Sequence, residues 1–456
     1  MAQLAACGRP APLDVVVVVI DTLRADRLGA YGNRAGLTPH LDALAARSVV
    51  FERAYAQSSW TNPSVASLLT SRYQSQHGVT NVMTILQASE STLSEVFWLN
   101  GYATAGFSAN AGISNERGFS QGYTHYVTYP PEAVGEGPFD VVPVRASVVN
   151  EGALEWLDEQ PRTKAAFLWL QYMEPHFPYV LHEPPPALDG APCPDPVKEK
   201  LNDPDGPPPA PGVMRGVELC YDATVEAADA AVGSLLEELR RRGRLERTVV
   251  VVTSDHGEEM LEHGRVGHGF TLYEEVIRVP LIVSVPWRTE RHDVREVVRL
   301  IDLAPTLLEL ADIRPPKTFE GRSFAAVLAR PDLWTRLRER VWPPPMPTPD
   351  AGALSELLSA ASGKHPRRGQ HLMSLVEDRS KVIVAEGEGP HDFYDLAADP
   401  TEKGTGPELD AATRAQLDRA LSASIQRAAR NPSKPVERTL DPETRRQLEM
   451  LGYLED

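Results

Sequence analysis

Cysteine, long apolar runs and positive charge are all in short supply in this sequence. The three cysteines among 456 residues, Cys7, Cys193 and Cys220, are too few and too widely spaced for a disulfide framework or a zinc knuckle, although one bridge between Cys193 and Cys220 stays open. No apolar stretch reaches the roughly 18 residues that a membrane span needs. Acidic residues outnumber basic ones by 63 to 46. The resulting net charge of -17 disfavours nucleic acid or an anionic membrane as a partner, because either would be repelled.

The N-terminus lacks the leader that its own sequence suggests. Leu4-Ala5-Ala6-Cys7 has the form of a lipoprotein cleavage site, but six residues before Cys7 cannot hold the apolar core of about 7–15 residues that a signal peptide requires. As written, the sequence predicts a cytoplasmic protein. A true start upstream of Cys7 would predict a periplasmic protein or a lipoprotein instead.

What the sequence does contain is an alternation of strand and helix patterns. Short apolar runs rich in β-branched residues predict buried strands at residues 14–21, 165–172, 248–254 and 280–286, with a shorter one at 104–108. Amphipathic segments predict helices at residues 38–47, 61–70, 91–100, 221–242 and 301–310. Strands that alternate with helices predict an α/β fold with a doubly wound, mostly parallel sheet.

Changes in composition along the chain predict its domains. We expect an N-terminal tail over 1–12, a catalytic α/β domain over 13–330 with a proline-rich insertion loop over 184–211, a small C-terminal α+β subdomain over 331–400, and a helical tail over 401–456. Apolar runs at 374–376 and 381–384 predict a small antiparallel sheet in the subdomain. Helical periods cover 411–428 and 442–451.

Several polar residues follow directly after predicted strands. Asp21 ends the first strand, His176 comes shortly after the second, and Asp255 and His256 end the third. Ligands of such sheets bind outside the carboxyl ends of the strands, so these side chains are candidates for one site. The two carboxylates and the imidazole of Asp21, Asp255 and His256 would suit one divalent metal ion, Mn²⁺, Zn²⁺ or Ca²⁺.

A hydroxyl nucleophile is predicted at the start of the second helix. Thr61 stands where an N-cap belongs, and the positive end of a helix favours a bound anion. A metal that touched Thr61 as a further ligand would lower the pKa of its hydroxyl. His176 and His268 could then bind the oxygens of a phosphate-like or sulfate-like group or protonate the leaving group, and Asn110 is a weaker substrate-binding candidate.

These segments together resemble the sulfatase family within the alkaline phosphatase superfamily. The resemblance rests on Ile20–Asp26, Thr38–Asp42, Thr61–Thr70, Glu174–Tyr179, Ser254–Glu258, Leu272–Leu281, Asp302–Thr306 and Tyr394–Glu402. It implies an alkaline-phosphatase-like sheet, a divalent metal ion and a hydrolase that acts on sulfuric or phosphoric esters.

The departures from that family point away from the usual sulfatase chemistry. A typical member carries Cys or Ser at the Thr61 position, oxidised after synthesis to formylglycine, and Arg at the Val65 position. The methyl group on Cβ of Thr61 prevents oxidation to an aldehyde, so no formylglycine is expected. Thr22 replaces a second acidic ligand, and His268 stands where a lysine is usual. These features look more like the phosphoryl-handling relatives, among them phosphonate monoester hydrolases and threonine-using phosphotransferases.

Three functions stay open on this sequence. The first is a metal-dependent esterase that uses Thr61 covalently, better suited to phosphate or phosphonate esters than to sulfate esters. The second is a phosphotransferase with the same site, and the third is an inactive, anion-binding homologue. The expected substrate is a small-molecule, glycan or lipid ester, and the sequence does not define the natural substrate or the oligomeric state.

Overall fold

The computed structural model describes residues 12–133, 141–142, 144–179, 186–188, 193–194, 208–329, 352–358, 371–387 and 391–450. Nearly all of the tail expected over 1–12, most of the insertion loop expected over 184–211, and the first residues of the expected subdomain lie outside these ranges.

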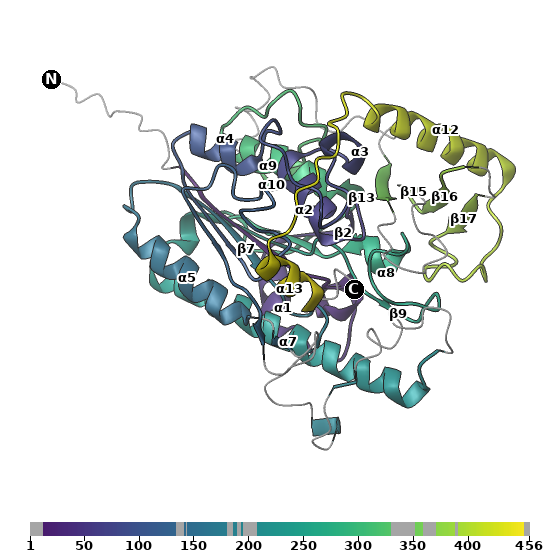
Figure 1. Cartoon of the computed structure of the whole chain (residues 1–456), viewed down its shortest axis with the longest axis horizontal. Coiled ribbons are helices and arrows are strands. Elements are labelled where there is room, and N and C mark those ends of the chain that lie inside the picture. The colour runs from purple at the N-terminus through teal and green to yellow at the C-terminus, as the bar shows by residue number, and fades with distance from the viewer. Residues whose placement is uncertain are drawn as a thin grey trace.

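A nine-stranded sheet forms the centre of the described structure (Figure 1). Its strands are β1 (Asp14–Ile20), β2 (Val49–Tyr55), β3 (Ala103–Ser108), β4 (His125–Thr128), β7 (Ala166–Tyr172), β8 (Thr248–Thr253), β11 (Arg278–Val279), β12 (Leu281–Ser284) and β13 (His292–Arg299). The order is β11-β2-β12-β8-β1-β7-β3-β4, with β13 also paired to β2. The run from β8 to β4 is parallel, and β12 joins it antiparallel. The mostly parallel α/β fold that the sequence predicts is confirmed.

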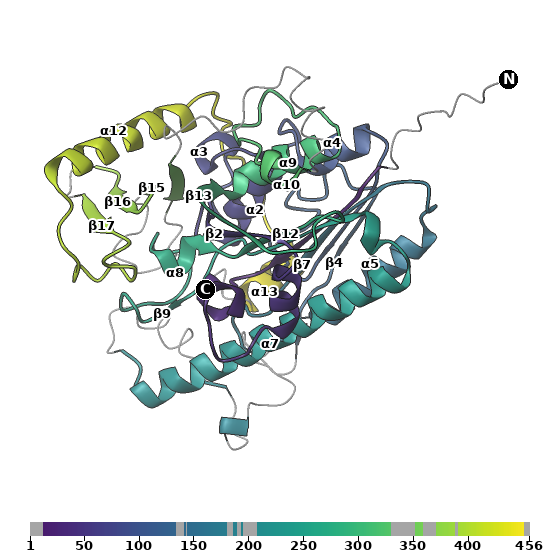
Figure 2. The ribbon, with the colours of Figure 1, turned by 180° about the vertical axis from the view of Figure 1, so that it is seen from behind.

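Helices cover both faces of this sheet. One face packs against α1 (Pro39–Ala45), α5 (Ala146–Glu159) and α7 (Pro211–Arg241), and the other against α2 (Thr61–Thr70), α4 (Leu93–Leu99), α9 (Leu303–Leu310) and α10 (Ala325–Leu328) (Figures 1 and 2). Alternate residues of β1 belong to the two cores: Val16 and Val18 to the first, Val15 and Val17 to the second. A strand buried on both faces explains the unbroken apolar run of β1.

A second, antiparallel sheet lies beside the first and confirms the predicted C-terminal subdomain. Its strands, in order, are β14 (Ala353–Leu358), β15 (His371–Glu377), β16 (Ser380–Ala385) and β17 (Asp392–Asp395). The helix α12 (Ala411–Ala428) packs on it through Leu417 and Leu421.

After α12 the chain returns to the large domain. The amide of Ile85 donates to Val436 O over 2.9 Å, and the amide of Arg438 donates to Met83 O over 3.0 Å. The helix α13 (Pro442–Met450) then buries Leu448 in the core that α1 and α7 share. The remaining short elements are α3 (Gln74–His77), α8 (Glu274–Ile277), β5 (Glu132–Ala133), β6 (Val141–Val142), β9 (Glu259–Met260), β10 (Val266–Gly267) and 3₁₀ turns at 25–27, 29–31, 186–188, 245–247 and 300–302.

Two sequence-based expectations need correction. The helix expected over 221–242 begins ten residues earlier, at Pro211, which the sequence had assigned to the insertion loop. Gly212 and Gly216 lower the helix propensity there, but Met214 and Val217 are buried, so packing overrides propensity. Several elements had no predicted counterpart, among them β2 and β13, whose charged residues interrupt the apolar pattern, and α5.

No helix in the described ranges is both long enough and apolar enough to cross a membrane.

The cysteine bridge that the sequence left open is present. Cys193 and Cys220 form a disulfide whose Cα atoms lie 5.9 Å apart, and it attaches the chain before α7 to that helix.

Replacing both bridged cysteines, as Cys193→Ala with Cys220→Ala, should lower the free energy of unfolding. The bridge closes a loop with a sequence separation of 27 residues, for which loop-closure entropy gives a loss of about 3.5 kcal/mol. Urea denaturation without reductant measures this loss. Cys7→Ala serves as the control and should leave the stability unchanged; equal stability of the double variant would contradict the prediction.

Candidate active site

The strand ends bring the predicted residues to one edge of the sheet. β8, β1, β7 and β3 are neighbours and run parallel, so their carboxyl ends meet at the same edge. Asp21 directly follows β1, Asp255 and His256 follow β8, and Asn110 follows β3. His176 comes four residues after the end of β7.

The helix α2 places Thr61 at this edge. The residue in the N-cap position is Trp60 and Thr61 is the first helical residue, which corrects the assignment of Thr61 as the cap. Trp60 has the extended backbone of a cap, and its carbonyl accepts the first helical hydrogen bond from the amide of Ser64. The hydroxyl of Ser64 also donates to Asp255 O over 2.7 Å. The start of the helix is thereby attached to the segment that carries the acid and the histidine.

Two acids, one histidine and the threonine hydroxyl converge. Thr61 Oγ1 lies 3.1 Å from His256 Nε2. That nitrogen lies 3.6 Å from Asp255 Oδ2 and 3.9 Å from Asp21 Oδ1. All four residues are fully buried. One ligand atom from each of Asp21, Asp255 and His256 lies within 4.8 Å of the others, the spacing of a metal site.

Each carboxylate has one oxygen held by the protein. Asp21 Oδ2 accepts from Asn110 Nδ2 over 2.7 Å and from Gln171 Nε2 over 3.3 Å. Asp255 Oδ1 accepts from the amides of Thr22 and His256 over 3.3 and 3.0 Å. The other oxygens, Asp21 Oδ1 and Asp255 Oδ2, are buried and have no hydrogen-bond partner among the described residues. Buried oxygens without a donor fit a bound cation, so this donor set suits a divalent metal ion.

The electrostatics of the acids support the same fit. Burial, and then repulsion from Asp255, raise the pKa of Asp21 well above its usual range. Burial also raises the pKa of Asp255, although His256 opposes the shift. Two carboxylates in a site that penalises their charge indicate that a positive charge belongs between them.

Three histidines line up beside this group. The ring of His268 lies between those of His256 and His176, with centroid distances of 4.5 and 5.0 Å. Nδ1 of each ring faces an oxygen of the protein: Gly257 O for His256, Glu258 Oε1 for His268 and Phe177 O for His176. Each ring therefore approaches a ligand through Nε2. Burial lowers the pKa of both His176 and His268 well below its usual value, and repulsion from the neighbouring histidine adds to the shift.

The structure thus brings Asp21, Thr61, Asp255 and His256 together, with His176 and His268 beside them. Asn110, predicted to bind substrate, donates to Asp21, and its role toward a substrate stays a prediction.

The sequence analysis also missed supporting residues. Gln171, which helps to hold Asp21, stands inside the buried strand β7, and a lone amide in that apolar run was a usable signal. Glu258, the partner of His268, directly follows the Asp-His-Gly segment.

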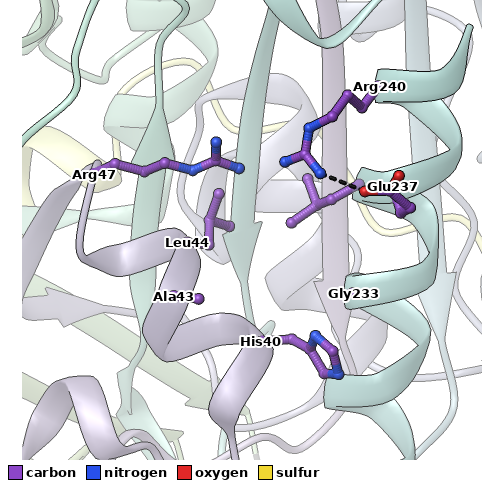
Figure 3. A pocket seen from close by; sticks show the side chains of 8 residues that line it. His40, Ala43, Leu44, Arg47, Gly233, Glu237 and Arg240 are labelled. Carbon is purple, nitrogen blue, oxygen red and sulfur yellow. Dashed lines mark hydrogen bonds and ion pairs between the residues drawn. The ribbon is translucent and has the colours of Figure 1, made fainter.

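A recess between α1 and α7 is separate from this site (Figure 3). It is lined by His40, Ala43, Leu44, Arg47, Gly233, Leu236, Glu237 and Arg240, and an Arg240–Glu237 ion pair lies at its rim. None of the predicted site residues lines it, so it does not enter the function proposed below.

Comparison with known proteins agrees with the site. The family model described as Sulfatase matches residues 14–313. The chain is 28% identical over 422 residues to an ulvan-active sulfatase of Formosa agariphila, covering 86% of this chain and 77% of that protein. It is 26% identical over 403 residues to iduronate 2-sulfatase of Mus musculus, covering 70% and 72%. The solved structure of a phosphonate monoester hydrolase of Agrobacterium radiobacter has a TM-score of 0.68 and 21% identity over 94% of this chain and 100% of that chain.

Together with the family match, the buried acids and the hydroxyl at the carboxyl edge of the sheet identify an ester hydrolase of the alkaline phosphatase superfamily. Within that class, the chain belongs to the sulfatase family, whose enzymes use a divalent metal ion. The expectations of family, fold and enzyme class are confirmed.

Asp21→Asn should stabilise the protein when metal has been removed. Because the pKa of Asp21 is raised on folding, the folded protein keeps a proton that the unfolded chain releases above about pH 4. The contribution of Asp21 to the free energy of unfolding therefore falls as the pH rises above about 4. Asparagine does not titrate, so the variant avoids this loss, which is about 1.4 kcal/mol for each unit by which folding raises the pKa. Urea denaturation with a chelator should show the gain at pH 8 and a smaller gain at pH 4.5.

The matching measurement adds Mn²⁺ to both proteins at pH 8. Wild type should gain stability from binding and Asp21→Asn should gain little, because it has lost a ligand. Equal gains, or a loss of metal-free stability in the variant, would contradict this account of the acids.

Proposed function

We propose that this protein is a metal-dependent hydrolase of phosphate or phosphonate esters in which Thr61 is the nucleophile. The observation that carries the proposal is the 3.1 Å approach of Thr61 Oγ1 to His256 Nε2, beside the two buried acids. The sulfatase relatives support ester hydrolysis, and the phosphonate monoester hydrolase with the same fold supports a phosphorus substrate.

Asp21, Asp255, His256 and Thr61 would hold the metal ion. When bound, the cation lowers the pKa of the Thr61 hydroxyl and neutralises charge on the substrate. Asn110 and Gln171 orient Asp21, and the amides of Thr22 and His256 orient Asp255. Such supporting contacts fix which oxygen of each acid faces the ion.

The hydroxyl of Thr61 first loses its proton to solvent, and the covalent step then forms a bond between Thr61 Oγ1 and phosphorus as the bond to the leaving oxygen breaks. An anionic ester bound beside His176 and His268 would favour their protonated forms, whose Nε2–H groups would then donate to the non-bridging oxygens or give a proton to the leaving oxygen. Water then attacks phosphorus in line, which releases phosphate or phosphonate and restores the threonine hydroxyl. A sulfated formylglycine hydrate can expel sulfate by collapse to the aldehyde, whereas a threonine ester lacks that exit. This favours phosphorus esters over sulfate esters.

The charge of the site points to a monoanionic ester. Two carboxylates balance one divalent cation, and the buried Val65 supplies no positive charge where the family usually has arginine. A phosphonate monoester or a phosphodiester carries one negative charge at neutral pH, whereas a phosphate monoester carries nearly two. An ester with a single negative charge is therefore repelled less by the carboxylates of this site than an ester with two.

The disulfide bears on the compartment. Bridges such as Cys193–Cys220 persist in oxidising surroundings, which supports the periplasmic alternative over the cytoplasmic one.

Thr61→Ala should reduce turnover by at least about 10³-fold, because the covalent route is lost. The assay is hydrolysis of an aryl phosphonate monoester with added Mn²⁺, with peptide-mass analysis of quenched wild type for a phosphonylated Thr61 peptide. Thr70→Ala is the matched control: it removes a buried hydroxyl from the other end of α2, where that hydroxyl donates to Ala66 O. Turnover that survives in Thr61→Ala would refute the nucleophile.

A substrate panel tests the choice of ester. Aryl phosphonate monoester, phosphodiester, phosphate monoester and aryl sulfate are compared at equal concentration with Mn²⁺, Zn²⁺ or Ca²⁺. We expect the first two to have the highest kcat/KM, and the sulfate to be slower by about 10-fold or more, a difference of about 1.4 kcal/mol in the barrier. A preference for the sulfate would contradict the proposal.

A further inference from the structure

The residue after Asp21 has an unusual backbone. Thr22 has a φ of 55°, in the left-handed region, and is the one β-branched residue with a positive φ in the described part of the chain. A branched side chain is crowded in that conformation, so the surroundings must impose it. Such outliers cluster at functional sites.

The surroundings of Thr22 do impose that backbone. Its amide donates to Asp255 Oδ1 over 3.3 Å, and its carbonyl accepts from the hydroxyl of Tyr221 over 2.7 Å. The same hydroxyl accepts from the amide of Arg24 over 2.9 Å. Tyr221 is fully buried on α7 and thus fixes the turn from both sides.

The side chain of Thr22 has no such support. Its hydroxyl oxygen is buried and has no hydrogen-bond partner among the described residues. Asp21 Oδ1, on the preceding residue, and Asp255 Oδ2 are likewise buried without a hydrogen-bond partner among the described residues. The Thr22 amide contacts the other oxygen of the Asp255 carboxylate. One cation that bound all three oxygens would explain why each of them is buried without a donor.

We propose that the Thr22 hydroxyl is a neutral oxygen ligand of the metal ion held by Asp21, Asp255 and His256, and that it makes the site prefer Mn²⁺ or Zn²⁺ to Ca²⁺. The inference rests on the metal site of the proposed function and extends it to metal selection. Because position 22 carries a hydroxyl in place of an acid, the other ligands of the site are two carboxylates, from Asp21 and Asp255, and the imidazole of His256. Ca²⁺ favours a larger set of oxygen ligands, often several carboxylates, whereas imidazole ligands suit transition metals.

The test measures metal binding itself. Full-length protein stripped with a chelator is titrated with MnCl₂ and, separately, with CaCl₂ in a calorimeter. Thr22→Val keeps the branched shape but lacks the hydroxyl, so its Kd for Mn²⁺ should rise about 10-fold or more. Thr22→Ser keeps the hydroxyl and should stay within about threefold of wild type. Thr22→Asp adds a charged oxygen and should tighten Ca²⁺ binding about 10-fold or more.

The matched control is Thr248→Val. Thr248 is a buried threonine at the start of β8, the strand whose other end leads to Asp255, and its hydroxyl bonds to Arg244 O. Its metal affinity should equal that of wild type. Circular dichroism of each variant checks the fold.

The outcomes separate this inference from the proposed function. Wild-type Mn²⁺ affinity in Thr22→Val overturns the inference and leaves the site of Asp21, Asp255 and His256 standing. Wild type that binds no divalent cation overturns the proposed function as well. If Thr22→Val does not fold, the other two variants decide: no gain of Ca²⁺ affinity in Thr22→Asp, or a large loss of Mn²⁺ affinity in Thr22→Ser, overturns the inference.

Discussion

The burial of Asp21 beside Asp255 is the constraint on which the rest of the site depends. Burial raises the pKa of both acids, and their mutual repulsion adds to the shift for Asp21. Without a cation such a pair opposes folding. In the described structure, the nearby hydrogen-bond donors contact one oxygen of each carboxylate and leave the other without a donor. For Asp21 these donors are Asn110 and Gln171. That division preserves a cation site at the expense of the stability of the metal-free chain, a trade often seen at functional sites.

The helix α2 extends the same constraint to Thr61, the proposed nucleophile. Every residue of α2 is buried, so its start cannot move without disturbing the core. Ser64 attaches the start to Asp255 O, and Ser67 near the middle contacts His77 Nε2 over 2.9 Å. Nδ1 of His77 accepts from the amide of Val79, and burial lowers the pKa of this histidine to about 3, so it is neutral and donates to the helix. Thr61 is therefore positioned by packing as well as by polar contacts.

The sequence predicted the parts of this arrangement that depend on local pattern. The unbroken run of β1 predicted a strand buried on both faces, and the rule for strand ends placed Asp21 with Asp255. It failed where partners lie far apart in the chain. Nothing near Asn110 indicates that it contacts Asp21, and nothing near Thr22 indicates that Tyr221, 199 positions later, fixes its carbonyl. Local propensity determines where helices and strands form, whereas tertiary contacts determine the role of a polar side chain.

The departures from the family are coherent with one another, and this argues against an inactive homologue. Relative to the family pattern that the resemblance implies, Thr22 removes one negative charge and Val65 and His268 remove two positive charges, so the losses partly offset each other. A chain that had lost its chemistry would have no reason to keep two unfavourable buried acids, each with an oxygen that lacks a donor. Replacing them with apolar residues would relieve the penalty at once. Their retention beside Thr61 and three histidines fits a site that still binds a cation and an anion.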